Sequence, residues 1–449
     1  MIAVSSHPLF AHPTPESIVA WRHGEAISVA RFLGDVARVA AALPPGRHVL
    51  NTCSDRYCFA VGLAATLVSG RVSLLPSTLT QEVAGHLRAF APDVCCLNDG
   101  KRDVFGLPVV IYPDGPPMDI APREIPLIAG DSLIAWVFTS GSTGKPVPHQ
   151  KTWGALVKNV HAEGELLGLL DGRRHTIVGT VPAQHMYGFE STVMVALQSG
   201  AAFASGRPLF PADICSAIAA VPRPRVLVTT PFHLRALLDA SVDIPDLDLL
   251  VSATAPLSPN LVREAEARCS APLLEIYGST ETGQIACRRP VETAEWRLFP
   301  GVRLAEHDGR VWASGGHVEG NVAMDDVLEI TGPDRFLLHG RSADMINIAG
   351  KRSSLAYLNH QLCAVPGVVD GAFFIPDEET PDGVTRLIAI VVAPGMTAAT
   401  LTQALRARIE PAFLPRRVLF VAGLPRNTTG KLPADALRTL IAGHSKRQP

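Results

Sequence analysis

Short apolar runs rich in valine, isoleucine and leucine alternate along the chain with segments of helical periodicity. The runs that predict strands are Leu133–Phe138, His175–Val181, Arg225–Thr230, Leu247–Ser252 and Leu273–Tyr277. Continuous apolar runs of this length are typical of strands covered on both faces. Between the last two runs, Ser258 followed by a proline predicts the start of a helix over Pro259–Cys269. This order predicts an α/β fold with a large N-terminal domain of layered mixed or parallel sheets.

The C-terminal part has a different pattern, which predicts a small α+β unit. Its candidate strands are Val368–Ile375, Leu387–Ala393 and Val418–Val421. Its candidate helices are Leu355–Cys363 and Ala398–Glu410. The pattern changes near Gly340–Asp344. We therefore expect a large domain over residues 1–341 and a small, mobile C-terminal domain over residues 342–449.

Composition narrows the class of protein. The 449 residues are 47% hydrophobic and 18% charged, with a net charge of −2. This composition excludes a disordered chain, and it lacks the basic excess of a nucleic-acid-binding protein. No stretch of about 20 residues is free of charged or helix-breaking residues, so we expect no membrane span.

The eight cysteines are scattered and form no C-x-x-C pair, which argues against a zinc or redox site. The N-terminal segment MIAVSSHPLF lacks the basic start and apolar core of an export signal. We therefore expect a cytoplasmic protein with buried, reduced thiols.

A loop rich in glycine and hydroxyl residues follows the first predicted strand. Its residues are Thr139, Ser140, Gly141, Ser142, Thr143, Gly144 and Lys145. Glycines let backbone N–H groups approach an anion closely, and hydroxyls and a lysine add donors, so the loop is a candidate polyphosphate site. It is not a Walker A loop, because Thr139 stands where that motif has its first glycine and Pro146 follows the lysine. The alternative is an ordinary polar loop.

A second polar segment follows the run that ends at Tyr277 and contains Gly278, Ser279, Thr280 and Glu281. Open α/β sheets bind ligands beyond the carboxyl ends of their strands. An aromatic ring there can stack on a base, and a carboxylate can hold Mg²⁺. The alternative is a plain strand-to-turn junction.

Two further segments carry charged groups. Asp326 precedes Arg341, and these side chains could bind ribose hydroxyls and phosphate oxygens, or form an interdomain salt bridge. Lys431 lies in the loop Asn427–Leu432, where a lone lysine is usually a solvated surface charge.

Taken together, the order and spacing of the four segments resemble the adenylate-forming superfamily. This superfamily includes acyl- and aryl-CoA synthetases, the adenylation domains of peptide synthetases and firefly luciferase, and the chain looks most similar to stand-alone aryl-acid ligases. The likeness covers about residues 20–440 and includes Val251–Leu257. It implies that the glycine- and hydroxyl-rich loop wraps the β- and γ-phosphates of ATP. It also implies that Tyr277, with Gly278 and Ser279, binds adenine and that Asp326, or its neighbour Asp325, binds ribose with help from Arg341.

The resemblance also implies a reaction. ATP converts a carboxylic acid to an acyl adenylate and pyrophosphate, and the thiol of coenzyme A or of an acyl carrier protein then takes the acyl group. Thr280 would contact the α-phosphate, Glu281 would hold Mg²⁺, and Lys431 would bridge the carboxylate and the α-phosphate. The C-terminal domain of such enzymes rotates between the two half-reactions, and Ile348–Ser354 would line the passage for the phosphopantetheine arm.

The chain departs from the superfamily pattern at two positions. Val147 stands where the phosphate loop usually continues with lysine, although Lys145 is present two residues earlier. Ala343 stands at the hinge position, which is usually aspartate or lysine, and Asp344 follows it. A small hinge residue is physically acceptable, but the extent of domain rotation is left open.

The segment Val181–Phe189 resembles the part of hydroxycinnamate ligases that lines the acid pocket. Its predicted substrate-binding residues are His185, Tyr187 and Gly188, joined by Ala253, Thr254 and Ala255 from the Val251–Leu257 segment. A hydroxybenzoate-like or hydroxycinnamate-like acid is therefore expected. The alternatives are that the aromatic residues are plain core, that the chain is a fatty-acyl ligase or a light-emitting relative, or that it binds a nucleotide without turnover.

Overall fold

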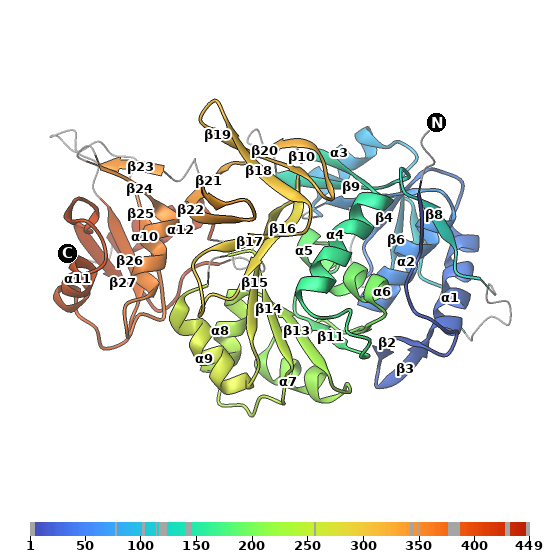
Figure 1. Cartoon of the computed structure of the whole chain (residues 1–449), viewed down its shortest axis with the longest axis horizontal. Helices are drawn as coiled ribbons and strands as arrows, with labels where there is room; N and C mark the ends of the chain where they lie inside the picture. The colour runs from blue at the N-terminus through green and yellow to red at the C-terminus, as the bar shows by residue number, and fades with distance from the viewer. Residues whose placement is uncertain are drawn as a thin grey trace.

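The computed structural model describes residues 5–76, 79–100, 104–113, 115, 124–140, 146–255, 257–341, 345–348, 351–375, 387–426 and 432–445. Two large sheets with their helices form one layered body, and a smaller unit at the C-terminal end lies beside it (Figure 1). The predicted α/β fold with a smaller α+β unit is confirmed.

The larger sheet has the strand order β21-β22-β17-β16-β15-β14-β13-β11-β12-β2-β3. In chain order these strands are β2 Ile18–Arg22, β3 Glu25–Ser28, β11 Thr176–Gly179, β12 Ala202–Ala204, β13 Arg225–Thr229, β14 Leu249–Ser252, β15 Leu273–Ser279, β16 Gly283–Arg288, β17 Trp296–Leu298, β21 Asp326–Gly332 and β22 Arg335–Arg341. The pairs from β2 through β15 are parallel, and the strands that follow β15 pair antiparallel. The carboxyl ends of the parallel strands therefore share one edge.

Strand β13 shows why its sequence is apolar without alternation. Val226 and Val228 pack into the core that contains Leu156 of α4 (Trp153–Leu166). Leu227 points into a second core, formed with α7 (Pro211–Ala219), α8 (Pro231–Asp239) and α9 (Pro259–Cys269). Successive side chains of a strand face opposite sides, so both faces of this sheet are covered.

The second sheet has the order β10-β9-β5-β4-β6-β7. Its strands and helices are β4 His48–Asn51, β5 Val72–Pro76, β6 Cys95–Asn98, β7 Val109–Ile111, β9 Leu133–Ser140, β10 Pro146–Thr152, α1 Val29–Ala42, α2 Arg56–Val68 and α3 Gln81–Phe90. Strand β10 was not predicted; it pairs antiparallel with β9. The strand and its partner are the two arms that enter and leave the predicted phosphate loop.

Helix α2 lies between the two sheets. It contacts β4 and β5 of the second sheet, and its first residue, Arg56, reaches the larger sheet. The Arg56 guanidinium is 2% exposed and donates to the carbonyl oxygens of Gly179, Val181 and Ala204. A buried cation is tolerated when its N–H donors are hydrogen-bonded. Because Arg56 belongs to the helix that contacts the second sheet and donates to carbonyl oxygens at the larger sheet, it connects the two sheets.

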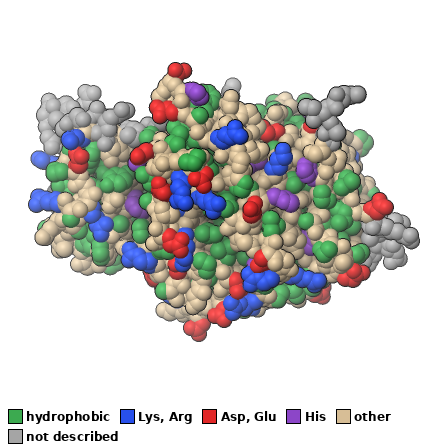
Figure 2. Space-filling model, in the orientation of Figure 1, with side chains coloured by type: hydrophobic (Ala, Val, Ile, Leu, Met, Phe, Trp, Pro, Cys, Tyr) green, Lys and Arg blue, Asp and Glu red, His purple; other side chains and the backbone are tan. Residues whose placement is uncertain are grey.

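The remaining elements of the N-terminal part are short. They are β1 Ser6–Pro8, β8 Leu127–Ala129, α5 Met186–Gly188, the π-helix η1 Phe189–Met194, α6 Val195–Ser199, and a three-stranded sheet of β18 Val302–His307, β19 Arg310–Gly315 and β20 Val318–Ala323. The three-stranded sheet lies near β16 and β10 (Figure 1). On the face drawn in Figure 2, acidic and basic side chains are interspersed.

The C-terminal unit has its own hydrophobic core. Its elements are β23 Met345–Ile348, β24 Lys351–Ser354, α10 Leu355–Cys363, β25 Asp370–Phe374, β26 Ile388–Val392, α11 Ala398–Arg406, the 3₁₀ turn η3 Pro411–Phe413, β27 Arg417–Phe420 and α12 Ala434–Ser445. The predicted helix over Ala398–Glu410 was too long. Glu410 is extended, with ψ 145°, because a residue before proline disfavours the helical conformation.

Close contacts join this unit to the larger body. Ser354 donates to the carbonyl oxygen of His339, and the Asn260 amide donates to that of Ala364 at 3.4 Å. Gly340 has φ +119°, and a Cβ there would lie 2.6 Å from Ser354 Oγ, so the close approach of these two segments requires glycine. The boundary at residues 341 and 342 stays a prediction.

Each of the eight cysteines is free, and six of them are buried, as expected for reduced thiols. Among the helices of the described residues, none combines the length and the apolar composition needed to cross a membrane.

Candidate functional site

The predicted nucleotide residues Tyr277 and Asp326 meet at the end of the larger sheet. Tyr277 lies near the end of β15 and Asp326 begins β21, and the Tyr277 hydroxyl donates to Asp326 Oδ2 at 2.5 Å. Asp326 also pairs with Arg341 across β21 and β22. The sheet therefore brings together three positions that lie far apart in the sequence.

Aromatic side chains hold the Tyr277 ring from one side. The rings of Trp296 and Phe336 have their centroids 5.5 Å and 5.6 Å from that of Tyr277. The Arg288 guanidinium lies over Trp296, 4.4 Å from its centroid. Tyr277 itself is partly exposed. A ring fixed in this way can offer its exposed part to a planar group such as a base.

The turn after β15 is tied together by its own hydroxyls. Thr282 Oγ1 accepts from the Ser279 N–H at 3.2 Å, and Ser279 Oγ accepts from the Thr282 N–H at 3.2 Å. A Cβ on Gly278 would collide with the carbonyl oxygen of Gly283, so this close approach requires glycine. The turn leaves Thr280 half-buried and the Glu281 side chain 39% exposed.

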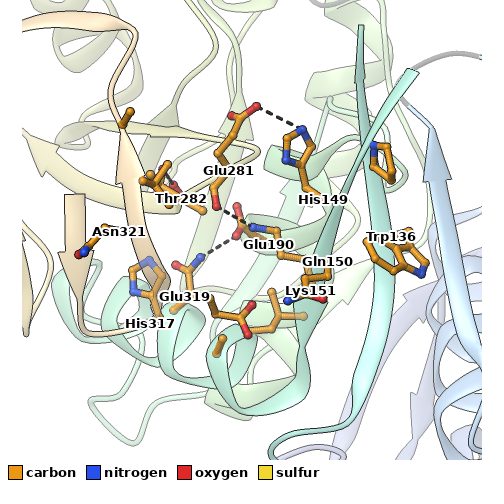
Figure 3. A pocket seen from close by; sticks show the side chains of 17 residues that line it. Trp136, His149, Gln150, Lys151, Glu190, Glu281, Thr282, His317, Glu319 and Asn321 are labelled. Carbon is orange, nitrogen blue, oxygen red and sulfur yellow. Dashed lines mark hydrogen bonds and ion pairs between the residues drawn. The ribbon is translucent and has the colours of Figure 1, made fainter. Parts of the chain in front are cut away.

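Two residues of β10 that were not predicted contact this turn. His149 Nε2 lies 2.9 Å from Thr139 Oγ1 and 3.4 Å from Glu281 Oε1. Lys151 is 8% exposed and donates to the Glu281 carbonyl oxygen at 3.4 Å. Figure 3 shows His149 and Glu281 pointing toward one another from β10 and the turn. The first residue of the predicted phosphate loop and the predicted metal ligand thus share one histidine.

A pocket of about 600 Å³ opens beside Glu281. Its polar wall is formed by His149, Lys151, Glu190, Glu281, His317 and Glu319 (Figure 3). Pockets of 300–1,000 Å³ are typical of small-molecule sites. None of the residues predicted to bind the acid lines the described part of this pocket.

Two buried carboxyl groups, Glu190 on the pocket wall and Glu163, belong to this part of the molecule. Burial raises the pKa of Glu163 to about 8 and raises that of Glu190, whose Oε1 accepts from the Asn159 amide at 2.6 Å. Burial also lowers the pKa of Lys151, although three carboxylates around it act in the opposite direction. The charge on this side of the site therefore depends on groups that are largely buried.

The segment predicted to bind the acid is largely buried. The Tyr187 side chain is 6% exposed, and its hydroxyl lies 3.1 Å from the carbonyl oxygens of both Thr229 and Val251. Gly188 packs so closely on Pro182 that a Cβ would collide with the proline carbonyl. His185 caps α5 and is half-buried. Since the Tyr187 hydroxyl is already engaged, packing is the role that its contacts support.

The second part of the predicted acid site lies at the end of β14. Ala253 is 7% exposed, Thr254 has φ +79°, and Ala255 is half-buried. A threonine with positive φ is strained, and such strain is frequent near ligand sites. Both segments lie at the carboxyl edge of the parallel strands.

Several predicted residues lie outside the described residues. These are Gly141, Ser142, Thr143, Gly144, Lys145, Ala343 and Lys431, and the side chains of Ser140 and Arg341. Their assignments to phosphate, hinge and catalytic roles stay predictions.

The set of donors around Glu281 fits a magnesium site of the kind completed by a nucleotide. The described residues contain no group of three or more histidine, cysteine or carboxylate side chains that could hold a metal ion. Mg²⁺ is usually bound by one or two carboxylates together with phosphate oxygens and water. The exposed carboxylate of Glu281, which shares His149 with the first residue of the predicted phosphate loop, meets that requirement.

Comparison with known proteins decides the family. The model of the AMP-binding enzymes matches residues 24–311, and the model of their C-terminal domain matches residues 359–431. The chain belongs to the AMP-binding enzyme family. The predicted superfamily is therefore confirmed. At the level of the family, two further predictions are confirmed: the class of AMP-forming acid–thiol ligase, and the cofactors ATP, Mg²⁺ and coenzyme A.

Curated relatives of this AMP-binding enzyme are CoA ligases. It is 32% identical to a 4-coumarate–CoA ligase of Rhodobacter capsulatus over 297 residues, which cover 65% of this chain and 73% of the relative. It is 26% identical to a 3-hydroxybenzoate–CoA/4-hydroxybenzoate–CoA ligase of Thauera aromatica over 469 residues, which cover 92% and 85% of the two chains.

Solved structures share the fold of this AMP-binding enzyme. ATP-bound MatB from Rhodopseudomonas palustris superposes with a TM-score of 0.81 at 22% identity, covering 96% of this chain and 97% of that chain. The o-succinylbenzoate CoA synthetase MenE from Bacillus subtilis superposes with a TM-score of 0.80 at 17% identity, covering 97% and 99%.

Proposed function

We propose that this enzyme adenylates a small aromatic carboxylic acid with ATP and transfers the acyl group to the thiol of coenzyme A. The observation that carries the substrate class is the set of curated relatives, which are named for coumarate, hydroxybenzoates, chlorobenzoate and indoleacetate. The geometry supports the nucleotide half of the proposal, because the Tyr277–Asp326 pair and Glu281 lie on one edge of the sheet.

In the first half-reaction, the acid's carboxylate oxygen attacks the α-phosphorus of ATP, and pyrophosphate leaves. Two anions must approach, so positive charge and oriented N–H groups are needed to lower the barrier. We assign this task to Lys431, with Thr280 at the α-phosphate and the loop Thr139–Lys145 at the β- and γ-phosphates. Glu281 would hold Mg²⁺, which when bound offsets the charge of the phosphates.

The nucleoside is held apart from the reacting atoms. Tyr277, with Gly278 and Ser279, would bind adenine, and Asp326 with Arg341 would bind the ribose. Because the Tyr277 hydroxyl donates to Asp326, base and sugar sites are coupled through one hydrogen bond. The phosphates would then lie toward Thr280 and Glu281, which follow Tyr277 in the same turn.

In the second half-reaction, the thiol attacks the acyl carbon of the mixed anhydride and AMP leaves. We infer that coenzyme A is the acceptor, because the curated relatives are CoA ligases. An acyl carrier protein presents the same phosphopantetheine thiol and is the second acceptor to test. The C-terminal unit, with Ile348–Ser354 along the thiol passage, would change position between the half-reactions.

The acid would lie between the segments Val181–Phe189 and Ala253–Ala255 at the carboxyl edge of the sheet. His185 and Gly188 would contact the acid, and Tyr187, whose hydroxyl is bonded to the carbonyl oxygen of Thr229, packs beside them. Apolar walls with few polar groups suit an aromatic ring.

Acid-dependent exchange of labelled pyrophosphate into ATP tests the proposal. Benzoates, hydroxybenzoates, hydroxycinnamates and fatty acids are compared at equal concentration, and the expected result is exchange with aromatic acids only. Exchange with fatty acids alone would show that the substrate is a fatty acid and not an aromatic acid. No exchange with any acid would favour a protein that binds a nucleotide without turnover. Coenzyme A and a carrier protein are then offered separately.

A further inference from the structure

Strand β10 presents a row of side chains to the site. Successive side chains of a strand face opposite sides, so Val147, His149 and Lys151 share one face. Val147 is apolar and 43% exposed, whereas His149 and Lys151 both reach Glu281. On this face of β10, His149 and Lys151 are therefore the side chains that can form hydrogen bonds.

His149 contacts the carboxylate of Glu281. Its Nε2 lies 3.4 Å from Glu281 Oε1 and 2.9 Å from Thr139 Oγ1. The imidazole is only 22% exposed, because β9 and the turn after β15 lie on either side of it. A side chain that packs between two others restricts the rotation of the more exposed of them, which here is Glu281. His149 therefore limits the positions that the Glu281 carboxylate can take.

Lys151 contacts the main chain of the same residue. Its ammonium donates to the Glu281 carbonyl oxygen at 3.4 Å, and Glu319 and Glu281 supply negative charge around it. A buried ammonium is costly unless it is paired and hydrogen-bonded. Figure 3 shows Lys151 on the pocket wall with the carboxylates around it. The lysine thus anchors the backbone of the turn that carries Glu281.

We propose that His149 and Lys151 are positioning residues that aim Glu281 at a divalent cation bound with the nucleotide, His149 through its carboxylate and Lys151 through its main chain. This inference rests on the proposed function, because ATP and Mg²⁺ are the ligands. It assigns to β10 a role in cation binding that is separate from the chemistry of the acid.

The role predicts which quantity changes. Removing a group that orients a metal ligand lowers metal affinity about 10- to 100-fold. His149→Leu therefore raises the Mg²⁺ concentration required for half-maximal ATP binding about tenfold or more. The KM of the acid stays within about twofold, because the polar contacts of His149 with described residues are to Thr139 and Glu281 and not to the predicted acid segment. A general structural defect would instead change both quantities.

The experiment measures ATP binding by calorimetry, without acid, over a series of Mg²⁺ concentrations. The variants are His149→Leu, His149→Gln and Lys151→Met, and thermal melting is recorded for each. His149→Gln keeps a side-chain donor and is expected to recover most of the Mg²⁺ affinity. His161→Leu and Lys158→Met, on the exposed face of α4, are the matched controls and should behave as the unmodified enzyme.

Each outcome has a distinct meaning. Unchanged Mg²⁺ dependence in His149→Leu, or equal loss in His149→Leu and His149→Gln, overturns the inference. If Lys151→Met does not fold, the two His149 variants decide the matter. If the unmodified enzyme binds ATP without any dependence on Mg²⁺, the nucleotide site of the proposed function is wrong, and that failure is visible before any variant is compared.

Discussion

The hydroxyl of Tyr277 donates to the carboxylate of Asp326 at 2.5 Å, although the residues lie 49 positions apart. The antiparallel strands that follow β15 return the chain to the same edge and make the contact possible. One hydrogen bond thus connects the residue predicted to bind adenine with the residue predicted to bind ribose.

Tyr277→Phe removes the donor and leaves the aromatic packing on Trp296 and Phe336. A hydrogen bond to a charged group contributes about 1.5–3 kcal/mol. We expect the KM of ATP to rise about tenfold while kcat changes little, because the pair positions the nucleotide outside the reacting atoms. Steady-state pyrophosphate exchange at varied ATP measures this. A fall in kcat at unchanged KM would contradict the role.

Lys431→Ala removes the cation assigned to the first half-reaction. Loss of one charge-stabilising group costs about 10²- to 10³-fold in rate, so adenylation should fall by about a hundredfold or more. Thioester formation from preformed acyl adenylate should fall much less, and single-turnover assays separate the two steps. Equal loss in both steps would count against the assignment.

Gly188→Ala places a Cβ against the carbonyl oxygen of Pro182. Overpacking of this kind costs about 1–3 kcal/mol, so the free energy of unfolding in urea should decrease by that amount. The KM of the acid should also rise, because the displaced backbone belongs to the predicted acid segment. Gly206→Ala is the matched control, since a Cβ there meets no atom within 4 Å.

The stability of the protein should decrease as the pH rises from 7 to 8. Burial raises the pKa of Glu163 to about 8, so the folded state retains a proton that the unfolded state has lost. The stabilisation is present at low pH and is lost as the pH rises through the folded pKa, at no more than about 1.4 kcal/mol per pH unit. Glu163→Gln should reduce this slope and leave the part due to Glu190, and the exposed neighbour Glu165→Gln should leave the slope unchanged.

The range from pH 7 to pH 8 is chosen because buried histidines change the stability in the opposite direction at lower pH. Burial lowers the pKa of His12, His233 and His317 to about 4. These residues reduce stability as the pH falls through the pKa of an ordinary imidazole, about 6.5, so most of their effect lies below pH 7. Urea unfolding at pH 7.0, 7.5 and 8.0 measures the carboxyl contribution, and an unchanged slope in Glu163→Gln would refute the prediction.

The local signals in the sequence were strongest where a cap defines an end. Helix α9 begins after Ser258, whose Oγ accepts from the Leu261 N–H, and both ends were predicted. Helix α10 also follows a serine cap, at Ser354, and was predicted at both ends. A short-range hydrogen bond of this kind can be recognised without knowledge of the rest of the fold.

Strand β10 was missed because Pro146 and Pro148 fall within it and its side chains are largely polar. Edge strands tolerate proline, since one side of their backbone has no partner strand. His149 and Lys151 therefore escaped notice, and their alternate spacing was the available signal. The contacts of Tyr187 depend on carbonyl oxygens of β13 and β14, whose position the sequence does not contain.

The guanidinium of Arg56 has mechanical consequences for the whole enzyme. Its hydrogen bonds to carbonyls at the ends of β11 and β12 resist sliding of one sheet past the other. The large body should therefore move as a rigid block. The proposed movement of the C-terminal unit during a catalytic cycle would then leave the geometry of both sheets unchanged.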